Sequence, residues 1–111
     1  MTRLTRGEIY RVPVPPGGDP KRSRCFVIVS RQTLLDSKAD RVICAPINTR
    51  CDGLESQVAV GVSQGLKQES CANCDHLTLI DKALLTNFVG ILSAAQLGEL
   101  RRALRVALEV E

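Results

Sequence analysis

The 111-residue sequence contains no tryptophan, a single histidine and only three aromatic residues, Tyr10, Phe26 and Phe88. Three aromatic rings are too few for the stacking platform on which many single-strand binders lay nucleobases. They are also too few to line the aromatic groove in which SH3 modules hold peptides. Because His76 is the only histidine, a mechanism that needs two histidines within one chain is excluded.

Long apolar runs are also missing. No run is long enough to span a membrane, and no signal-peptide hydrophobic region follows Met1. We therefore expect a cytoplasmic protein that does not contact a membrane. A reducing compartment keeps thiols reduced, and an odd number of cysteines does not suit a disulfide framework. We accordingly expect free thiols at all five cysteines: Cys25, Cys44, Cys51, Cys71 and Cys74.

The length and composition predict one globular domain over residues 1–111, with 44% hydrophobic and 24% charged residues. A domain of this size buries a modest fraction of its surface, so a homodimer would add stability. The net charge of +3 is unevenly distributed. Residues 1–50 carry ten Lys or Arg and four Asp or Glu (+6), and residues 51–111 carry five and eight (−3). This asymmetry favours a surface for a polyanion in the first half, although small domains often show some imbalance.

Short apolar segments separated by glycine and proline are typical of a small β-rich domain. Strands are predicted at residues 8–14, 25–29, 41–47, 57–62, 70–77 and 88–92, with one helical turn within residues 31–40. A helix is predicted after Ser93, because Gln96 completes a capping box with it. Its apolar stripe comprises Leu97, Leu100, Leu104 and Leu108. Val106 and Val110 lie off this stripe, and we interpret them as surface residues rather than a subunit contact.

The segment Cys71–His76 has the appearance of a metal site, but it offers one C-x-x-C pair where zinc usually needs two. On a strand, Cys74 and His76 would face away from Cys71 and Asp75. A redox pair normally lies at a helix N-terminus, which this pair does not. We therefore predict no metal site and interpret these cysteines as half-buried structural residues. No phosphate-binding loop or dinucleotide fingerprint is present either.

A basic cluster, Lys21, Arg22 and Arg24, lies where a Pro- and Gly-rich loop meets a buried strand. The planar guanidinium group matches two phosphate oxygens at once and stays charged at any cellular pH. The cluster therefore indicates phosphate binding, with a merely solvated loop as the ordinary alternative.

Five segments resemble, in order and spacing, the motifs of the MazF/PemK toxin family. They are RGEIY at 6–10, SRCFVIVS at 23–30, VICAPI at 42–47, ESCANCDHL at 69–77 and LLTNFVGILS at 84–93. The resemblance spans about residues 6–108. It implies a mainly β fold, an SH3-like, partly open small barrel of the MazF/CcdB type with a C-terminal amphipathic helix.

The resemblance also implies a sequence-specific, metal-independent endoribonuclease toxin without a cofactor. Such a toxin cleaves single-stranded RNA, mRNA foremost, through attack by the 2′-OH. The products carry 2′,3′-cyclic phosphate and 5′-OH ends. The expected partners are the RNA substrate, a second copy of the chain in a homodimer, and an inhibiting antitoxin of the MazE type.

Arg24 matches the catalytic arginine of the family, which stabilises the phosphorane and, by family analogy, transfers a proton. The family's catalytic threonine falls on Asn48, which lacks a hydroxyl, so Thr49 is the alternative. His76 replaces a family glutamine and either contacts a base or takes part in proton transfer. We thus predict Arg24, Asn48 and Thr49 as catalytic residues. The predicted RNA-binding residues are Lys21, Arg22, Asp75 and His76.

Two other functions remain open from the sequence. One is a non-catalytic CcdB-like toxin that binds a protein target, but such toxins act through a C-terminal end that contains tryptophan. The other is an SH3-like protein-binding module, which the scarcity of aromatic residues disfavours.

Overall fold

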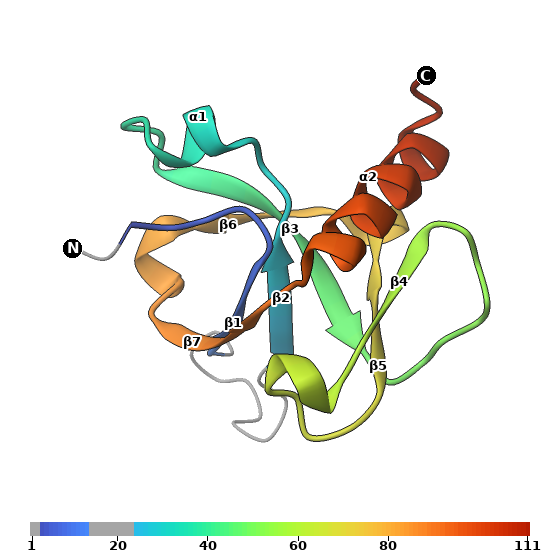
Figure 1. The fold of residues 1–111 in the computed structure, drawn as a ribbon. Coiled ribbons are helices and arrows are strands. Elements are labelled where there is room, and N and C mark those ends of the chain that lie inside the picture. Colours follow the sequence, from blue (N-terminus) through green and yellow to red (C-terminus); the bar gives the residue numbers. More distant parts are fainter. Residues whose placement is uncertain (1–2, 14–23) are drawn as a thin grey trace.

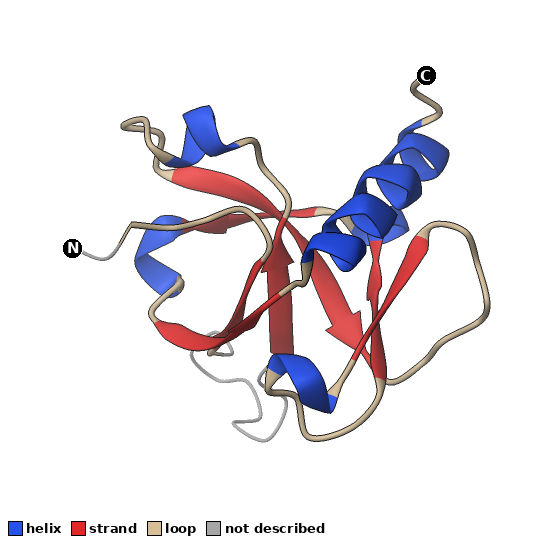
Figure 2. Ribbon diagram, viewed as in Figure 1, coloured by secondary structure: helices blue, strands red, loops and turns tan. Residues whose placement is uncertain are grey.

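The computed structural model describes residues 3–13 and 24–111 of the chain (Figures 1 and 2). The strands and most helical segments are short, and the long helix of the described residues is the last element. In chain order the elements are β1 (Glu8–Val12), β2 (Arg24–Ile28), α1 (Gln32–Leu35), β3 (Arg41–Asn48), β4 (Gln57–Val60), η2 (Val62–Gln64), β5 (Ser70–Asn73), η3 (Cys74–His76), β6 (Thr78–Asp81), η4 (Lys82–Leu84), β7 (Asn87–Ile91) and α2 (Ala94–Leu108).

The strands form one antiparallel sheet with the order β4-β5-β3-β2-β1-β7. The long strand β3 has two neighbours along one edge: its first half pairs with β6 and its last two residues pair with β5. The sheet curls into a partly open barrel, with α2 packed across one side (Figure 1). The prediction of a mainly β, half-barrel fold with a C-terminal helix is confirmed.

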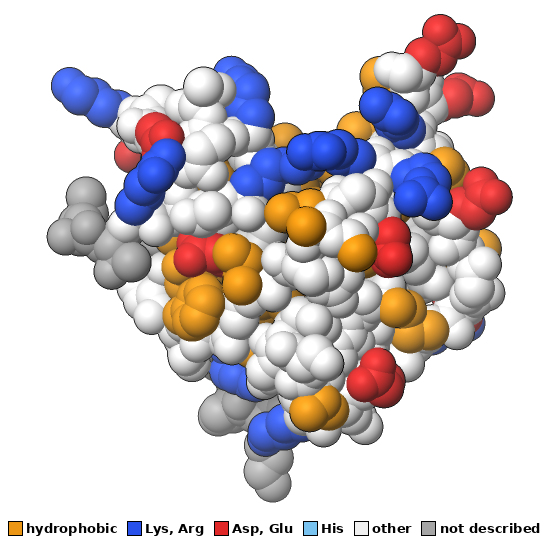
Figure 3. Space-filling view, viewed as in Figure 1, with side chains coloured by type: hydrophobic (Ala, Val, Ile, Leu, Met, Phe, Trp, Pro, Cys, Tyr) orange, Lys and Arg blue, Asp and Glu red, His pale blue; other side chains and the backbone are white. Residues whose placement is uncertain are grey.

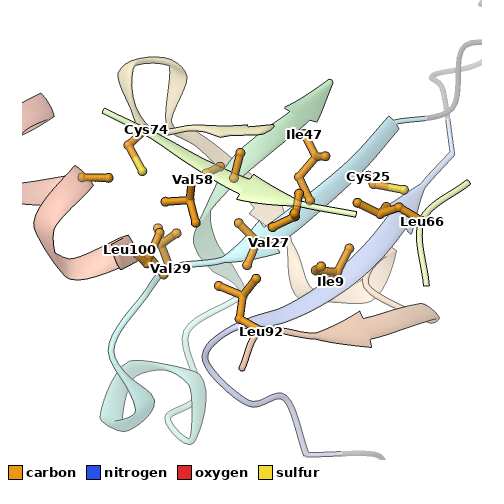
Figure 4. Close-up of a cluster of buried hydrophobic side chains, with 14 residues drawn as sticks. Ile9, Cys25, Val27, Val29, Ile47, Val58, Leu66, Cys74, Leu92 and Leu100 are labelled. Atoms are coloured by element: carbon orange, nitrogen blue, oxygen red, sulfur yellow. The ribbon is translucent and has the colours of Figure 1, made fainter. Parts of the chain in front are cut away.

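Two apolar clusters pack against the two faces of the sheet, and the central strand β2 is buried on both faces. Cys25, Val27 and Val29 point into the first cluster, with Leu100 of α2 (Figure 4), and Ile28 points into the second. The strand predicted at residues 25–29 is thus present as β2, and its unbroken apolar run is typical of a strand buried on both faces. The first cluster comprises Ile9, Cys25, Val27, Val29, Ala45, Ile47, Val58, Val60, Leu66, Ala72, Cys74, Leu92, Leu100 and Ala103. The second cluster comprises Tyr10, Val12, Ile28, Leu35, Val42, Cys44, Ile80 and Leu85.

The capping box predicted at the start of α2 is present. The Ser93 hydroxyl accepts from the Gln96 amide at 3.2 Å, and the Gln96 side chain accepts from the Ser93 amide at 2.8 Å.

The apolar stripe of α2 is buried over only part of its length. Leu100 is fully buried, but Leu108 is 57% exposed because the end of the helix extends past the sheet (Figure 1). The predicted apolar stripe is therefore wrong at its last residue. None of the helices in the described residues is long and apolar enough to cross a membrane.

The sequence prediction of one strand over residues 70–77 is wrong. Strand β5 ends at Asn73, and residues 74–76 form the turn η3. The turn is stabilised by the Asn73 side chain, which accepts a hydrogen bond from the Asp75 amide. A strand that the sequence analysis did not predict, β6, follows directly and pairs with β3.

Candidate active site

Arg24 and Asn48 lie at the neighbouring ends of two paired strands. Arg24 is the first residue of β2 and Asn48 is the last residue of β3. The antiparallel pairing runs from Cys25 with Ile47 to Ile28 with Cys44, so Arg24 and Asn48 each lie one residue beyond the last pair. Opposite residues of an antiparallel pair share a face of the sheet. The register therefore brings Arg24 and Asn48 to one face at one edge, and both are exposed.

The charge of Arg24 is not neutralised by a carboxylate within residues 3–13 and 24–111. The ion pairs there are Arg3 with Asp36, Arg41 with Asp81, and Arg50 with Asp52. On β1, Arg24 is opposite Val12, an apolar residue of the second cluster. An exposed guanidinium group beside apolar and amide neighbours is suited to bind an anion such as a phosphate group.

The loop after β3 begins with a side-chain turn. Asn48 Oδ1 accepts from the Arg50 amide at 3.0 Å, which leaves the Asn48 Nδ2 group as the donor that faces outward. Thr49 is exposed, and its hydroxyl forms no hydrogen bond with another described residue. Both alternatives for the family threonine thus lie at the strand end beside Arg24.

A disulfide links Cys51, three residues after Asn48, to Cys71 on β5, with a Cα–Cα distance of 5.6 Å. The prediction that all five cysteines are free thiols is therefore wrong for this pair. The physical reason is the path of the loop, which returns over β5 and brings the two Cα atoms into the range that a disulfide can bridge. The C-x-x-C pair is thereby separated, since Cys71 joins the disulfide while Cys74 is buried in the first cluster.

The remaining thiols, Cys25, Cys44 and Cys74, are buried. Burial raises the pKa of Cys44 to about 12, and burial together with the nearby Asp75 carboxylate raises that of Cys74 to about 11. Both thiols are protonated near neutral pH, so neither is suited to act as a nucleophile. In the part of the chain that the structure describes, no three His, Cys, Asp or Glu residues are grouped to hold a metal ion.

Asp75 and His76 lie on the turn η3 and are exposed. The turn connects β5 to β6 and spans the gap beside Ala45 and Pro46 of β3, where neither strand pairs. Pro46 is about 7 Å from Asn48 along the strand, at ~3.3 Å per residue. The structure thus places Asp75 and His76 on the same edge of β3 as Asn48. No hydrogen bond or ion pair within the described ranges connects them to Arg24, Asn48 or Thr49.

The structure adds two residues that the sequence analysis missed. The Ser56 hydroxyl donates to Asp75 Oδ2 at 2.6 Å, and Asn73 contacts both the Asp75 amide and the His76 ring. An asparagine two residues before Asp75 is a common turn signal, and it was the available clue to Asn73. The predicted RNA-binding residues Lys21 and Arg22 lie outside the described residues.

The fold is a small, toxin-like half-barrel, and the exposed Arg24 lies at one end of its central strand β2. The model of the family described as PemK-like, MazF-like toxin of type II toxin–antitoxin systems matches residues 5–108. The chain belongs to this family, whose MazF members are endoribonucleases. A comparison with curated protein sequences gave no match.

Solved structures of similar fold cover nearly the whole chain. The Mycobacterium tuberculosis toxin MazF-mt6 is 27% identical, with a TM-score of 0.80 over 94% of this chain and 98% of that one. A mycobacterial endoribonuclease in complex with its cognate antitoxin is 23% identical, with a TM-score of 0.78 over 97% of each chain. A MazE–MazF complex from Deinococcus radiodurans is 16% identical, with a TM-score of 0.78 over 100% of each. At these lower identities the last two show the fold alone.

Proposed function

We propose that this chain is an endoribonuclease toxin that cleaves single-stranded RNA, mRNA foremost, at a short sequence. The observation that carries the proposal is the exposed Arg24 beside Asn48 at the joined ends of β2 and β3. It is supported by membership of a family whose MazF toxins are endoribonucleases.

The reaction is an in-line attack by a ribose 2′-OH on the adjacent phosphorus. The 2′-oxygen loses its proton, the bond to the leaving 5′-oxygen breaks, and that oxygen takes up a proton. The fragments then end in a 2′,3′-cyclic phosphate and a 5′-OH. Negative charge grows on the non-bridging oxygens in the transition state, where fixed donors stabilise it most. Arg24 supplies the positive charge, and Asn48 Nδ2 or the Thr49 hydroxyl supplies a further donor.

The RNA strand approaches this edge through Lys21, Arg22, Asp75 and His76, and no metal ion or other cofactor takes part. We further propose that residues 1–111 act as one toxin domain in the cytoplasm, where mRNA is found. The active form is a homodimer that an antitoxin of the MazE type inhibits. Antitoxin complexes of the similar structures support this partner. Exposed apolar side chains, among them Leu79, Phe88 and Ile91, support a partner surface. Figure 3 shows apolar side chains exposed at several places on one face of the molecule.

The test is incubation of the purified chain with mixed-sequence RNA in the presence of EDTA, followed by sequencing of the fragment ends. We expect cyclic-phosphate ends at a recurring short sequence. Arg24→Ala should lower the cleavage rate on the order of 10²-fold, since it removes charge that the transition state needs. Arg41→Ala, at the opposite end of β3 and also exposed, is the matched control. Equal rates for the two variants, or a requirement for a divalent metal, would contradict the proposal.

A further inference from the structure

Asn73, at the end of β5, contacts two groups of the turn that follows it. Its Oδ1 accepts a hydrogen bond from the Asp75 amide at 2.9 Å. Its Nδ2 lies 3.3 Å from Nδ1 of His76. One carboxamide therefore both caps the turn and contacts the imidazole ring.

These two contacts determine which nitrogen of His76 carries the proton. A backbone N–H can only donate, so the side-chain atom that faces the Asp75 amide must be the oxygen of Asn73. The NH₂ group of Asn73, which is only a donor, then faces Nδ1 of His76. Nδ1 must accept with its lone pair, and the proton of the neutral ring is on Nε2.

The turn that holds this contact is anchored by the two residues directly before His76. Ser56 is 4% exposed, its hydroxyl donates to the Asp75 carboxylate, and its carbonyl accepts from the Cys74 amide at 3.0 Å. Cys74 is itself buried in the first cluster. The ring of His76 is exposed, and its Nε2 has no hydrogen-bonding partner in the part of the chain that the structure describes.

We propose that Asn73 is a positioning residue that holds His76 in the Nε2–H form, and that this N–H reads a keto base of the RNA. The inference rests on the proposed function. Unpaired bases in single-stranded RNA are open to contact along their edges. Guanine O6 and uracil O4 accept a hydrogen bond, whereas the amino groups of adenine and cytosine donate one. A ring nitrogen fixed as a donor that faces this keto or amino position of the base therefore favours guanine or uracil there.

The first arm of the test measures the position of the proton by NMR of protein labelled with ¹⁵N-histidine. The chain has one histidine, so one imidazole gives the signals. Asn73→Asp keeps an oxygen for the Asp75 amide but places a second acceptor against Nδ1. For the neutral ring we expect Nε2–H in the parent chain and Nδ1–H in this variant.

Ser56→Ala is the matched control, because it removes a contact of the same turn and leaves Asn73 and His76 intact. It should retain the Nε2–H form. A free imidazole already favours the Nε2–H form, so finding this form in the parent chain does not by itself test the role of Asn73. The test is the expected change to the Nδ1–H form in Asn73→Asp. An unchanged tautomer in that variant would overturn the role of Asn73. If the variant does not fold, Asn73→Ser keeps a capping oxygen that cannot reach the ring, and it should raise the Nδ1–H fraction.

The second arm measures base preference with RNAs that differ by one keto or amino base within the cleaved sequence. His76→Ala should reduce the preference by about threefold to tenfold, as the loss of one neutral hydrogen bond predicts, and should act on KM more than on kcat. His76→Gln retains an N–H donor and should retain most of the preference. An unchanged preference in His76→Ala would overturn the base contact. If no variant cleaves RNA, the proposed function and the base contact both fail, while the NMR arm still decides the role of Asn73.

Discussion

Cys71, which forms the disulfide with Cys51, is also the cross-strand partner of Asn48. The loop that starts at Thr49 is thus covalently held against β5 within three residues of the candidate catalytic asparagine. A cytosolic environment tends to reduce such a bond. The conformation of this part of the candidate site is therefore expected to depend on the redox state of the surroundings.

Removal of the disulfide should loosen this loop and destabilise the fold. A bridge that closes 20 residues restricts the unfolded chain by about 3 kcal/mol. Cys51→Ser should lower the free energy of unfolding in urea by this amount and should speed tryptic cleavage after the exposed Arg50. Dithiothreitol should have the same two effects on the parent chain and no further effect on Cys51→Ser. Equal cleavage after Arg50 with and without the reductant would contradict the prediction.

Asn48 should contribute more to RNA cleavage than Thr49. The register places Asn48 opposite Arg24 on one face, and its Oδ1 also organises the loop through the Arg50 amide. We expect Asn48→Ala to lower the cleavage rate on the order of 10²-fold, as loss of a transition-state donor does, and Thr49→Ala to lower it less. Single-turnover rates on one RNA test this. A larger effect from Thr49→Ala would identify the hydroxyl as the catalytic donor instead.

The buried thiols should make the fold sensitive to alkali. Burial raises the pKa of Cys44 from its ordinary value of 9.0 to about 12. The folded chain then keeps a proton that the unfolded chain releases above pH 9. The stabilising contribution is complete below that pH and is lost as the pH rises toward 12. The slope of unfolding free energy against pH approaches about 1.4 kcal/mol per unit for one such thiol.

Urea unfolding at stepped pH measures this slope. Cys44→Ala should be less stable at neutral pH but should lose stability more slowly above pH 9. The raised pKa values of Cys74 and Tyr10 act in both chains and cancel in the comparison. Identical slopes for the two chains would refute the assignment to Cys44.

Two glycines should respond in opposite directions to alanine. A Cβ on Gly90 of β7 would overlap the backbone carbonyl oxygen of Gln64 in η2, whereas a Cβ on Gly98 of α2 meets no heavy atom within 4 Å. Gly90→Ala should therefore lower the unfolding free energy by about 1–3 kcal/mol. Gly98→Ala should raise it by about 0.5–1 kcal/mol, because alanine favours the helix. Thermal and urea unfolding of both variants check the pair.

The parts of the fold that the sequence predicted depend on short-range physics. The capping box of Ser93 and Gln96 and the unbroken apolar run at 25–29 each determine one element locally, and both are present. The basic cluster pointed to Arg24 as a phosphate-binding residue, but a catalytic role for Arg24 and the choice of Asn48 came only from the family resemblance. Their adjacency follows from the β2–β3 register, which no local pattern contains.

The parts that the sequence did not predict depend on competition or on distant contacts. The sequence analysis predicted one strand over residues 70–77, but the Asn73 side chain offers the Asp75 amide a local partner, and the strand ends there. The Cys51–Cys71 disulfide depends on the return path of a loop. Strand β6 is exposed at three of its four residues, so its weak apolar pattern did not indicate a strand.

Gln96 has a second role besides capping, since its Nε2 donates to the Ala59 carbonyl on the outer margin of β4 at 3.2 Å. At the other end of the strand path, η2 lies so close to β7 that Gly90 tolerates no side chain. Open strand margins attract foreign strands and seed aggregates. Because α2 contacts the margin of β4 and η2 lies against β7, the chain is expected to resist fibril-like stacking at these two strands.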